Sequence, residues 1–212
     1  MVETVHVMRD HWWWRPGWRV GRSFYTWHVT FEDQPSVHQL AADYTPMFDG
    51  LPTLDPIPVR WLHLTMQGIG FTDEVDRADV GAIVDAARCR CAALAPFTVT
   101  LGPARVDPEA LMLPVRPPEP VVHLRAAIRA AIADVRGPDN VPEDSDDFRP
   151  HVSLAYSNAA GPAGPIAQRL TERLVTSAEI TVHRATLIDL NRDHKVYRWT
   201  DIAAAELGIP TG

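Results

Sequence analysis

The sequence has few cysteines, no long apolar run and no excess of positive charge. Its 212 residues include only two cysteines, Cys89 and Cys91. Nothing in this cysteine content suggests a disulfide-stapled secreted fold, and no second cysteine cluster exists to complete a zinc site. Both lie in a helical pattern, and we interpret both as helix packing residues. The longest apolar stretches fall far short of the roughly 20 residues that a membrane-spanning helix needs.

The charge balance is acidic. The formal net charge is −7, and the sequence pI is about 5.7. Proteins that coat long duplex nucleic acid are usually basic, so we expect no broad nucleic-acid surface, although a local pocket can still hold a nucleotide or an RNA end. The opening segment, MVETVHVMRDHWWWRPGW, has charges and proline where a signal peptide has an apolar stretch. We therefore expect a cytoplasmic protein, and we also expect a monomer that needs no cofactor.

Apolar periodicity predicts alternating strands and helices with no linker between separate domains. The predicted strands lie at 24–31, 60–71, 97–115 (a pair) and 149–157. The predicted helices lie at 34–48, 73–94, 118–135 and 164–174. Residues 137–148 read as an acidic loop, and 178–202 as a long hairpin that turns near Asn191–Asp193. This order indicates one α/β or α+β domain over residues 1–212.

Two of the predicted strands carry a histidine followed two residues later by a hydroxyl. Because side chains alternate between the faces of a strand, His63 and Thr65 share one face, opposite Leu62, Leu64 and Met66. His151 and Ser153 share a face in the same way, together with Arg149. Both strands follow an arginine and carry a similar pattern, which hints at two similar lobes.

Two pairs of histidine and hydroxyl side chains suit the cleavage of a phosphodiester. One group must take a proton from the attacking oxygen and another must give one to the leaving oxygen. Imidazole serves both roles because its pKa lies near neutrality. The hydroxyls can donate to the nonbridging oxygens, whose charge grows in the transition state. Two such strands facing one cleft would supply base, acid and two anchors without a metal ion.

HLTM at 63–66 and HVSL at 151–154 resemble the paired H-x-T/S motifs of the 2H phosphoesterase superfamily. This superfamily includes the bacterial RNA 2′,3′-cyclic phosphodiesterases, also called 2′-5′ RNA ligases. The resemblance covers nearly the whole chain except a Trp-rich N-terminal arm of about residues 1–20. It implies a bilobal fold of two mostly antiparallel sheets with outer helices around a central cleft. It also implies that His63 and His151 are the acid–base pair and that Thr65 and Ser153 hold the phosphate.

Other side chains are candidates for the same cleft, each with a structural alternative. His28 shares a face with Thr26 and Thr30, so we include it as a substrate-binding candidate beside a purely structural role. Arg149 is a second candidate, which could contact phosphate or pair with the acidic loop. Trp61 could stack a base, although we favour the interpretation that it covers the end of the sheet.

The Trp12–Trp14 run, with Arg15, Trp18 and Arg19, could contact a nucleobase, form a lid or a dimer contact, or pack on the fold as an arm. His183 and His194 lack the spacing of a metal site, so we expect no metal. The run EDSDD at 143–147 reads as a solvated loop.

The sequence therefore predicts a metal-independent phosphoesterase that opens 2′,3′-cyclic phosphates of RNA ends or nucleotides. One alternative is a noncatalytic protein that binds an RNA end or nucleotide. Others are 2′-5′ RNA end joining, or the cleavage of cyclic phosphates of small nucleotides such as ADP-ribose.

Overall fold

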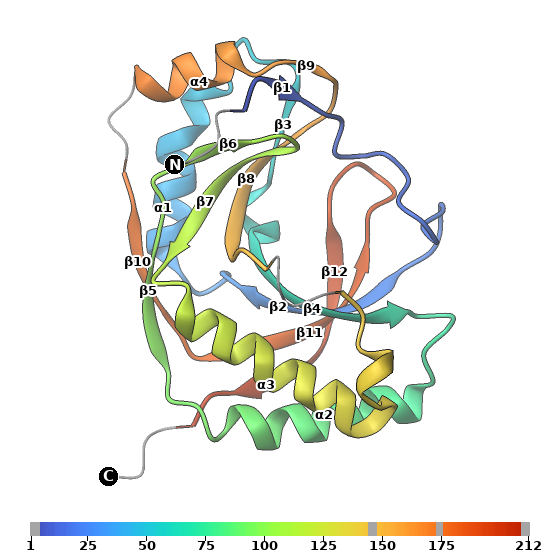
Figure 1. Ribbon diagram of the computed structural model, residues 1–212. Coiled ribbons are helices and arrows are strands. Elements are labelled where there is room, and N and C mark those ends of the chain that lie inside the picture. The colour runs from blue at the N-terminus through green and yellow to red at the C-terminus, as the bar shows by residue number, and fades with distance from the viewer. Residues whose placement is uncertain (1–4, 144–147, 173–175, 209–212) are drawn as a thin grey trace.

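The protein is a curled antiparallel sheet with helices on its outer side (Figure 1). The structure, a computed structural model, describes residues 5–143, 148–172 and 176–208. The sheet has ten strands, in the order β10-β5-β7-β8-β4-β2-β11-β12, with β3 paired to β8 and β6 paired to β7. Their bounds are β2 (Phe24–Thr30), β3 (Leu54–Pro56), β4 (His63–Phe71), β5 (Phe97–Leu101), β6 (Arg105–Asp107), β7 (Ala110–Arg116), β8 (His151–Ser157), β10 (Ala178–Val182), β11 (Arg184–Asn191) and β12 (Arg198–Glu206). A separate two-stranded sheet joins β1 (Val7–Met8) to β9 (Gly161–Pro162).

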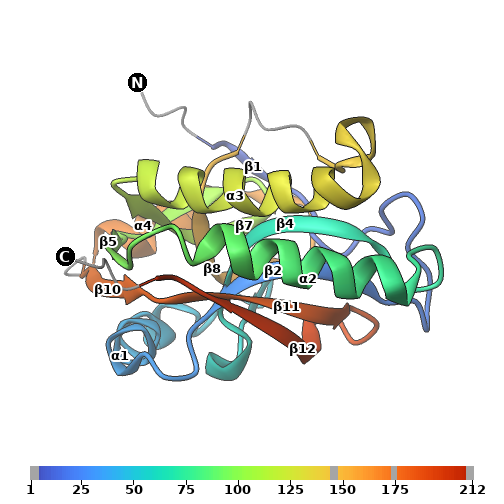
Figure 2. The same ribbon diagram turned by 90° about the horizontal axis from the view of Figure 1, so that it is seen from below.

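The sheet has two lobes, each covered by its own helices, and the chain crosses from one lobe to the other. Helices α2 (Arg77–Cys91) and α3 (Glu119–Arg136) lie side by side and pack on β12 and β4. Helix α1 (Pro35–Tyr44) packs on β10, and α4 (Gly164–Thr171) lies near β6 (Figures 1 and 2). Thus α1 follows a strand of one lobe and covers the other, and α3 does the reverse. Short helical turns occupy η1 (Thr45–Met47), η2 (Val59–Trp61) and η3 (Pro138–Asn140).

The two lobes meet where β4 pairs with β8. The register aligns Leu64 with Val152, and both side chains are fully buried. Each of these residues stands between the histidine and the hydroxyl of its motif. The pairing therefore brings the two motifs onto neighbouring strands at the centre of the molecule.

Local chemistry explains the elements next to this junction. In β2, Trp27 and Val29 face the hydrophobic core, whereas Thr26 and His28 face the concave side. Asp76 caps the N-terminus of helix α2, and its carboxylate accepts a hydrogen bond from the Ala78 backbone N–H at 2.8 Å. Helix α3 packs on β4, the strand that carries His63 and Thr65, whereas α2 packs on β12.

The predicted fold class is confirmed, with the refinement that the two sheets are joined edge to edge through β4 and β8. The strand pair predicted over 97–115 is three strands, β5, β6 and β7. The long hairpin predicted over 178–202 is also wrong in part. Only β11 and β12 form the expected hairpin, while β10 ends at Val182 and pairs with β5 in the other lobe. The prediction treated the segment as continuous because its apolar alternation shows no break where the chain passes between lobes.

The expectation for the two cysteines needs correction, and two predicted segments lie partly outside the described residues. Cys91 is buried in the core, but Cys89 is exposed, so only one of the two cysteines is a packing residue. They lie about 200° apart around the helix axis, so one helix face cannot bury both. Most of the expected acidic loop 143–147 and the last residues of the expected helix 164–174 lie outside the described residues. Within the described ranges, no helix is long and apolar enough to span a membrane.

Candidate active site

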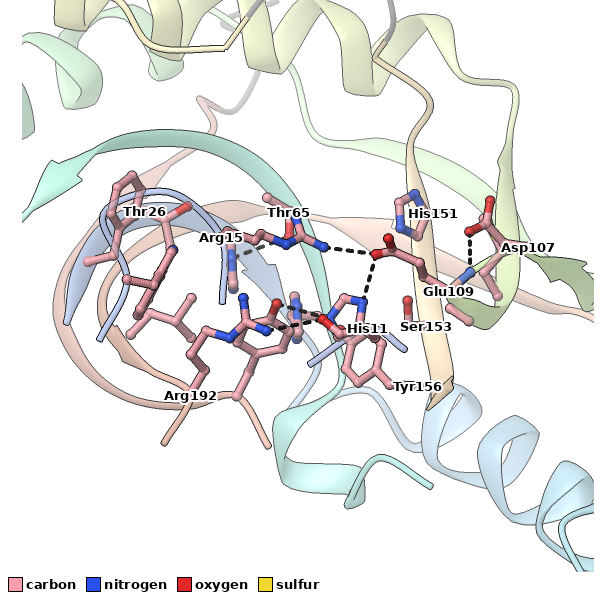
Figure 3. A pocket seen from close by; sticks show the side chains of 18 of the residues that line it. His11, Arg15, Thr26, Thr65, Asp107, Glu109, His151, Ser153, Tyr156 and Arg192 are labelled. Atoms are coloured by element: carbon pink, nitrogen blue, oxygen red, sulfur yellow. Dashed lines mark hydrogen bonds and ion pairs between the residues drawn. The ribbon is translucent and has the colours of Figure 1, made fainter. Parts of the chain in front are cut away.

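A cavity of about 450 Å³ opens on the concave side of the sheet where the lobes meet. His63 and Thr65 line it from β4, and His151 and Ser153 line it from β8. Figure 3 shows Thr65, His151 and Ser153 in the wall of this cavity. All four residues of the two predicted motifs therefore come together. The antiparallel register at Leu64 and Val152 places His63 beside Ser153 and Thr65 beside His151. Each histidine thus has the hydroxyl of the other motif as its cross-strand neighbour.

The backbone holds both imidazoles in the same way. Nδ1 of His63 lies 2.8 Å from the carbonyl oxygen of Trp61, and Nδ1 of His151 lies 2.8 Å from that of Arg149. A carbonyl oxygen can only accept, so in each ring Nδ1 carries the hydrogen and donates it. Nε2 is left as the atom that can take or give a proton. The same two-residue backbone clamp fixes both rings.

Burial sets the two histidines apart. His63 is 8% exposed, whereas His151 is exposed. Burial lowers the pKa of His63 to about 4, assisted by the nearby His151 and opposed by the hydrogen bond to the Trp61 carbonyl. At neutral pH the His63 ring is therefore neutral, and Nε2 has a free lone pair.

His28 supports the β4 motif from the neighbouring strand. Its ring stacks on that of His63 with centroids 4.4 Å apart and planes 4° from parallel. Its Nε2 lies 3.4 Å from the Thr65 hydroxyl, while its buried Nδ1 has no hydrogen-bond partner. Burial, with a smaller effect of His63, holds the pKa of His28 well below its usual range. His28 is 1% exposed, so it lines the cavity wall but offers a ligand little surface.

Arg149 and Trp61 lie at the margin. Arg149 is exposed and lines a second cavity that adjoins the first, and it forms no ion pair with any described residue. Trp61 belongs to η2 rather than to β4 and packs edge to face on Trp199, with ring centroids 4.7 Å apart. It does not line the cavity, which agrees with a role in covering the sheet.

The N-terminal arm packs across one side of the cavity. Its backbone is tied to one lobe by the hydrogen bond from the His11 N–H to the Ser157 carbonyl at 2.8 Å. It is tied to the other lobe by Arg192, whose guanidinium donates to the carbonyls of His11 and Trp13 at 3.1 and 3.3 Å. Trp12 is buried among aromatic rings, whereas Trp13 and Trp14 are about half exposed.

Three arm side chains, His11, Arg15 and Trp18, line the cavity itself. Arg15 reaches Glu109 at the turn between β6 and β7 at 3.0 Å (Figure 3). His11 contacts the Tyr197 hydroxyl at 2.9 Å. Burial, followed by nearby Arg15 and Arg192, lowers the pKa of His11 to about 3, so its 3.3 Å approach to Glu109 is not a salt bridge at neutral pH.

Sequence patterns missed several residues of this wall. Arg15 was noticed only as part of the tryptophan run, and Glu109, Tyr156, Arg192 and Tyr197 carried no local signal. Their place in the cavity depends on contacts between segments far apart in the chain. Within the described residues, no group of three or more His, Cys, Asp or Glu side chains is arranged to hold a metal ion, and His183 and His194 are both exposed.

Comparisons with known proteins agree with this architecture. TT0787 of Thermus thermophilus is 19% identical with a TM-score of 0.66, and the match covers 89% of this chain and 99% of that one. E. coli LigT complexed with phosphate is 17% identical with a TM-score of 0.63, over 88% and 98% of the two chains. E. coli LigT complexed with 3′-AMP is 18% identical with the same TM-score and coverage. No curated protein matches the sequence.

A family model described as the 2′-5′ RNA ligase superfamily matches residues 33–194. The matched segment contains both histidine motifs and excludes the N-terminal arm. It spans most of the chain, and the resemblance to the 2H phosphoesterases is confirmed. The protein therefore belongs to the 2′-5′ RNA ligase superfamily.

Proposed function

We propose that the protein opens 2′,3′-cyclic phosphates at RNA ends or on nucleotides, with His63 and His151 as the acid–base pair. The observation that carries this proposal is the matched pair of clamped imidazoles in one cavity. Each ring presents Nε2 for proton transfer, and each has a hydroxyl as its cross-strand neighbour. The comparisons add support, because E. coli LigT has been seen with phosphate and with 3′-AMP.

The reaction needs only water and these side chains. A water oxygen forms a bond to phosphorus while one ring P–O bond breaks on the opposite side. One imidazole takes the water proton, and the other gives a proton to the released ribose oxygen. The product is a ribose with one free hydroxyl and one phosphomonoester. No step in this scheme uses a metal ion, so we expect turnover in excess chelator.

Burial suggests which histidine begins as the base. His63 is neutral at pH 7 because burial lowers its pKa to about 4. A neutral ring can accept the water proton at once. His151 is the exposed member of the pair, and the proposal assigns it the role of the acid. In end joining, a 5′-hydroxyl would attack the cyclic phosphate in place of water and the same ring P–O bond would break, so the two histidines would keep these roles.

The hydroxyls hold the nonbridging oxygens in this proposal, and His28 prepares one of them. The buried Nδ1 of His28 has no partner, and an unpaired N–H there would cost more than an unpaired lone pair. The hydrogen therefore sits on Nε2 and is donated to the Thr65 oxygen, 3.4 Å away. The Thr65 hydroxyl is then left to donate its own hydrogen to the phosphate.

The first experiment measures kcat/KM on a 2′,3′-cyclic mononucleotide and on a short RNA with a cyclic end, with excess chelator. We expect His63→Ala and His151→Ala each to reduce turnover by about 10²- to 10⁴-fold, with unchanged circular dichroism. An exposed histidine outside the cavity, His123, provides the control variant His123→Ala. Substantial turnover in both single variants would rule out the acid–base pair. Tight product binding without turnover in the wild type would favour the noncatalytic alternative.

A second experiment tests the assignment of roles. A 4-nitrophenyl diester releases a phenolate that needs little help from an acid. The activity lost in His151→Ala should therefore shrink on this substrate, while the loss in His63→Ala should persist. The opposite pattern would assign the base to His151.

A further inference from the structure

A second cavity, of about 480 Å³, adjoins the catalytic one. The two share Thr65 and His151 in their walls, so a ligand held between the histidines has direct access to the second space. We refer to this space as the arginine groove, because Arg15, Arg105, Arg125 and Arg149 line it. The chain as a whole carries a net charge of −7, so this concentration of guanidinium groups is local.

The arginines that line the arginine groove outnumber its carboxylates. Two acidic residues line it, Asp107 and Glu143. Each already accepts from a backbone amide: Asp107 from the Glu109 N–H at 3.1 Å, and Glu143 from the Gly68 N–H at 3.5 Å. Neither lies within ion-pair distance of a described arginine.

The four arginines differ in how they are held. Arg15 is paired with Glu109. Arg125 is buried, donates through Nε to the Met66 carbonyl at 2.8 Å and lies 4.3 Å from the centre of the Phe148 ring. Arg105 and Arg149 are more accessible and pair with no carboxylate among the described residues; Arg105 makes only a weak contact with the Met112 sulfur at 3.8 Å. An arginine lining a cavity without an acidic partner is suited to bind a planar or tetrahedral anion.

The sheet register sets the distance from the groove to the reaction centre. Arg105 aligns with Met112, and Met112 aligns with Ser153. Residues aligned across strands point to the same face, so Arg105 projects on the face that carries Ser153, two strand spacings or roughly 10 Å away. Arg149 is linked more directly, because its backbone carbonyl holds the His151 ring.

We propose that the arginine groove is a subsite for a second phosphate group of the substrate, with Arg105 and Arg149 as its principal ligands. The inference rests on the proposed function, since it places the first phosphate between His63 and His151. The substrate class is then a cyclic phosphate that carries another phosphate on the same nucleoside. That group is either a terminal 5′-phosphate or the first internucleotide phosphate of an RNA chain.

Three substrates with one base distinguish these cases: a nucleoside 2′,3′-cyclic phosphate, the same compound with a 5′-phosphate, and a dinucleotide with a cyclic end. The readout is the kcat/KM of each longer substrate divided by that of the first. This ratio cancels any general effect of a substitution on the acid–base pair. We expect a ratio of about 10 or more in the wild type, as a charge-assisted contact provides. The longer substrate with the higher ratio identifies the source of the phosphate.

Arg105→Gln and Arg149→Gln should each lower the ratio severalfold, and the double variant should bring it close to one. Arg184→Gln is the matched control, because Arg184 is an exposed arginine that lines neither cavity. In the wild type, added salt should reduce kcat/KM more steeply for the preferred longer substrate. A ratio near one in the wild type, or a high ratio kept in the double variant, would overturn the subsite.

Binding separates failure of the subsite from failure of the proposed function. Calorimetry compares a nucleoside 3′-phosphate with the same compound bearing a 5′-phosphate, neither of which requires turnover. If no cyclic phosphate is hydrolysed, tighter binding of the bisphosphate that is lost in the double variant still supports the groove. Equal affinities in the wild type would refute it whether or not the enzyme turns over.

Discussion

Lowering the pH should destabilise the protein through its buried histidines. In the unfolded chain the ordinary pKa of His63 is 6.5, whereas burial in the folded protein lowers it to about 4. Between these values the unfolded state binds a proton that the folded state does not. The free energy of unfolding therefore falls as the pH drops below about 6.5.

The size of the effect follows from the two pKa values. One pKa unit corresponds to about 1.4 kcal/mol, so between pH 7 and pH 5 His63 alone should lower the free energy of unfolding by about 2 kcal/mol. Burial also lowers the pKa of His11, to about 3, so His11 should lower the free energy of unfolding by a similar amount. The pKa of His28 is lowered too, so His28 adds to the loss in the same direction. Since a domain of this kind is stable by about 5–15 kcal/mol, the combined loss is large.

Urea unfolding followed by tryptophan fluorescence at pH 7 and pH 5 measures this loss. His63→Gln removes the titrating ring, so the stability of this variant should fall by about 2 kcal/mol less than that of the wild type over the same pH change. His123→Gln alters an exposed ring on α3 and should follow the wild type. If the free energy of unfolding falls by the same amount in His63→Gln and in the wild type, the His63 ring does not pass from water into a desolvated site on folding.

Three substitutions test other parts of the structure. Leu64→Ala should cost about 2–5 kcal/mol in urea unfolding, because it leaves a cavity at the junction of the lobes; a cost below about 1 kcal/mol would contradict that packing. Arg192→Gln should free the carbonyls of His11 and Trp13 and speed proteolysis of the arm, and an unchanged cleavage rate would mean that other contacts suffice. Thr65→Val should lower kcat on a cyclic nucleotide by about 100-fold with the fold kept, and a full kcat would remove the hydroxyl from the transition state.

The motif residues could be predicted because their signal is local. Strand alternation alone places His63 with Thr65 and His151 with Ser153 on polar faces. The apolar residues between them, Leu64 among them, indicate which face turns inward. The sequence does not reveal that Leu64 and Val152 are direct neighbours across two strands, because strand pairing depends on the whole sheet.

The rest of the cavity wall could not be predicted because its contacts are long-range. Arg192 donates to the carbonyl of His11, 181 positions away in the chain. Nothing in the local pattern at either residue indicates the other. The same reason explains why β10 was joined to the final hairpin, since its partner strand, β5, lies about 80 positions earlier.

The central pairing of β4 with β8 fixes the two imidazoles independently of the segments that form the rest of the cavity wall. The spacing of the two imidazoles is a property of adjacent strands, whereas the arm, the β6–β7 turn and the final hairpin form the remaining walls as separate attachments. A redesign could therefore replace these attachments to accept a different ligand while leaving the proton-transfer pair untouched. Catalytic geometry and ligand specificity would then be set by different parts of the chain: the β4–β8 pair for the first, and the surrounding segments for the second.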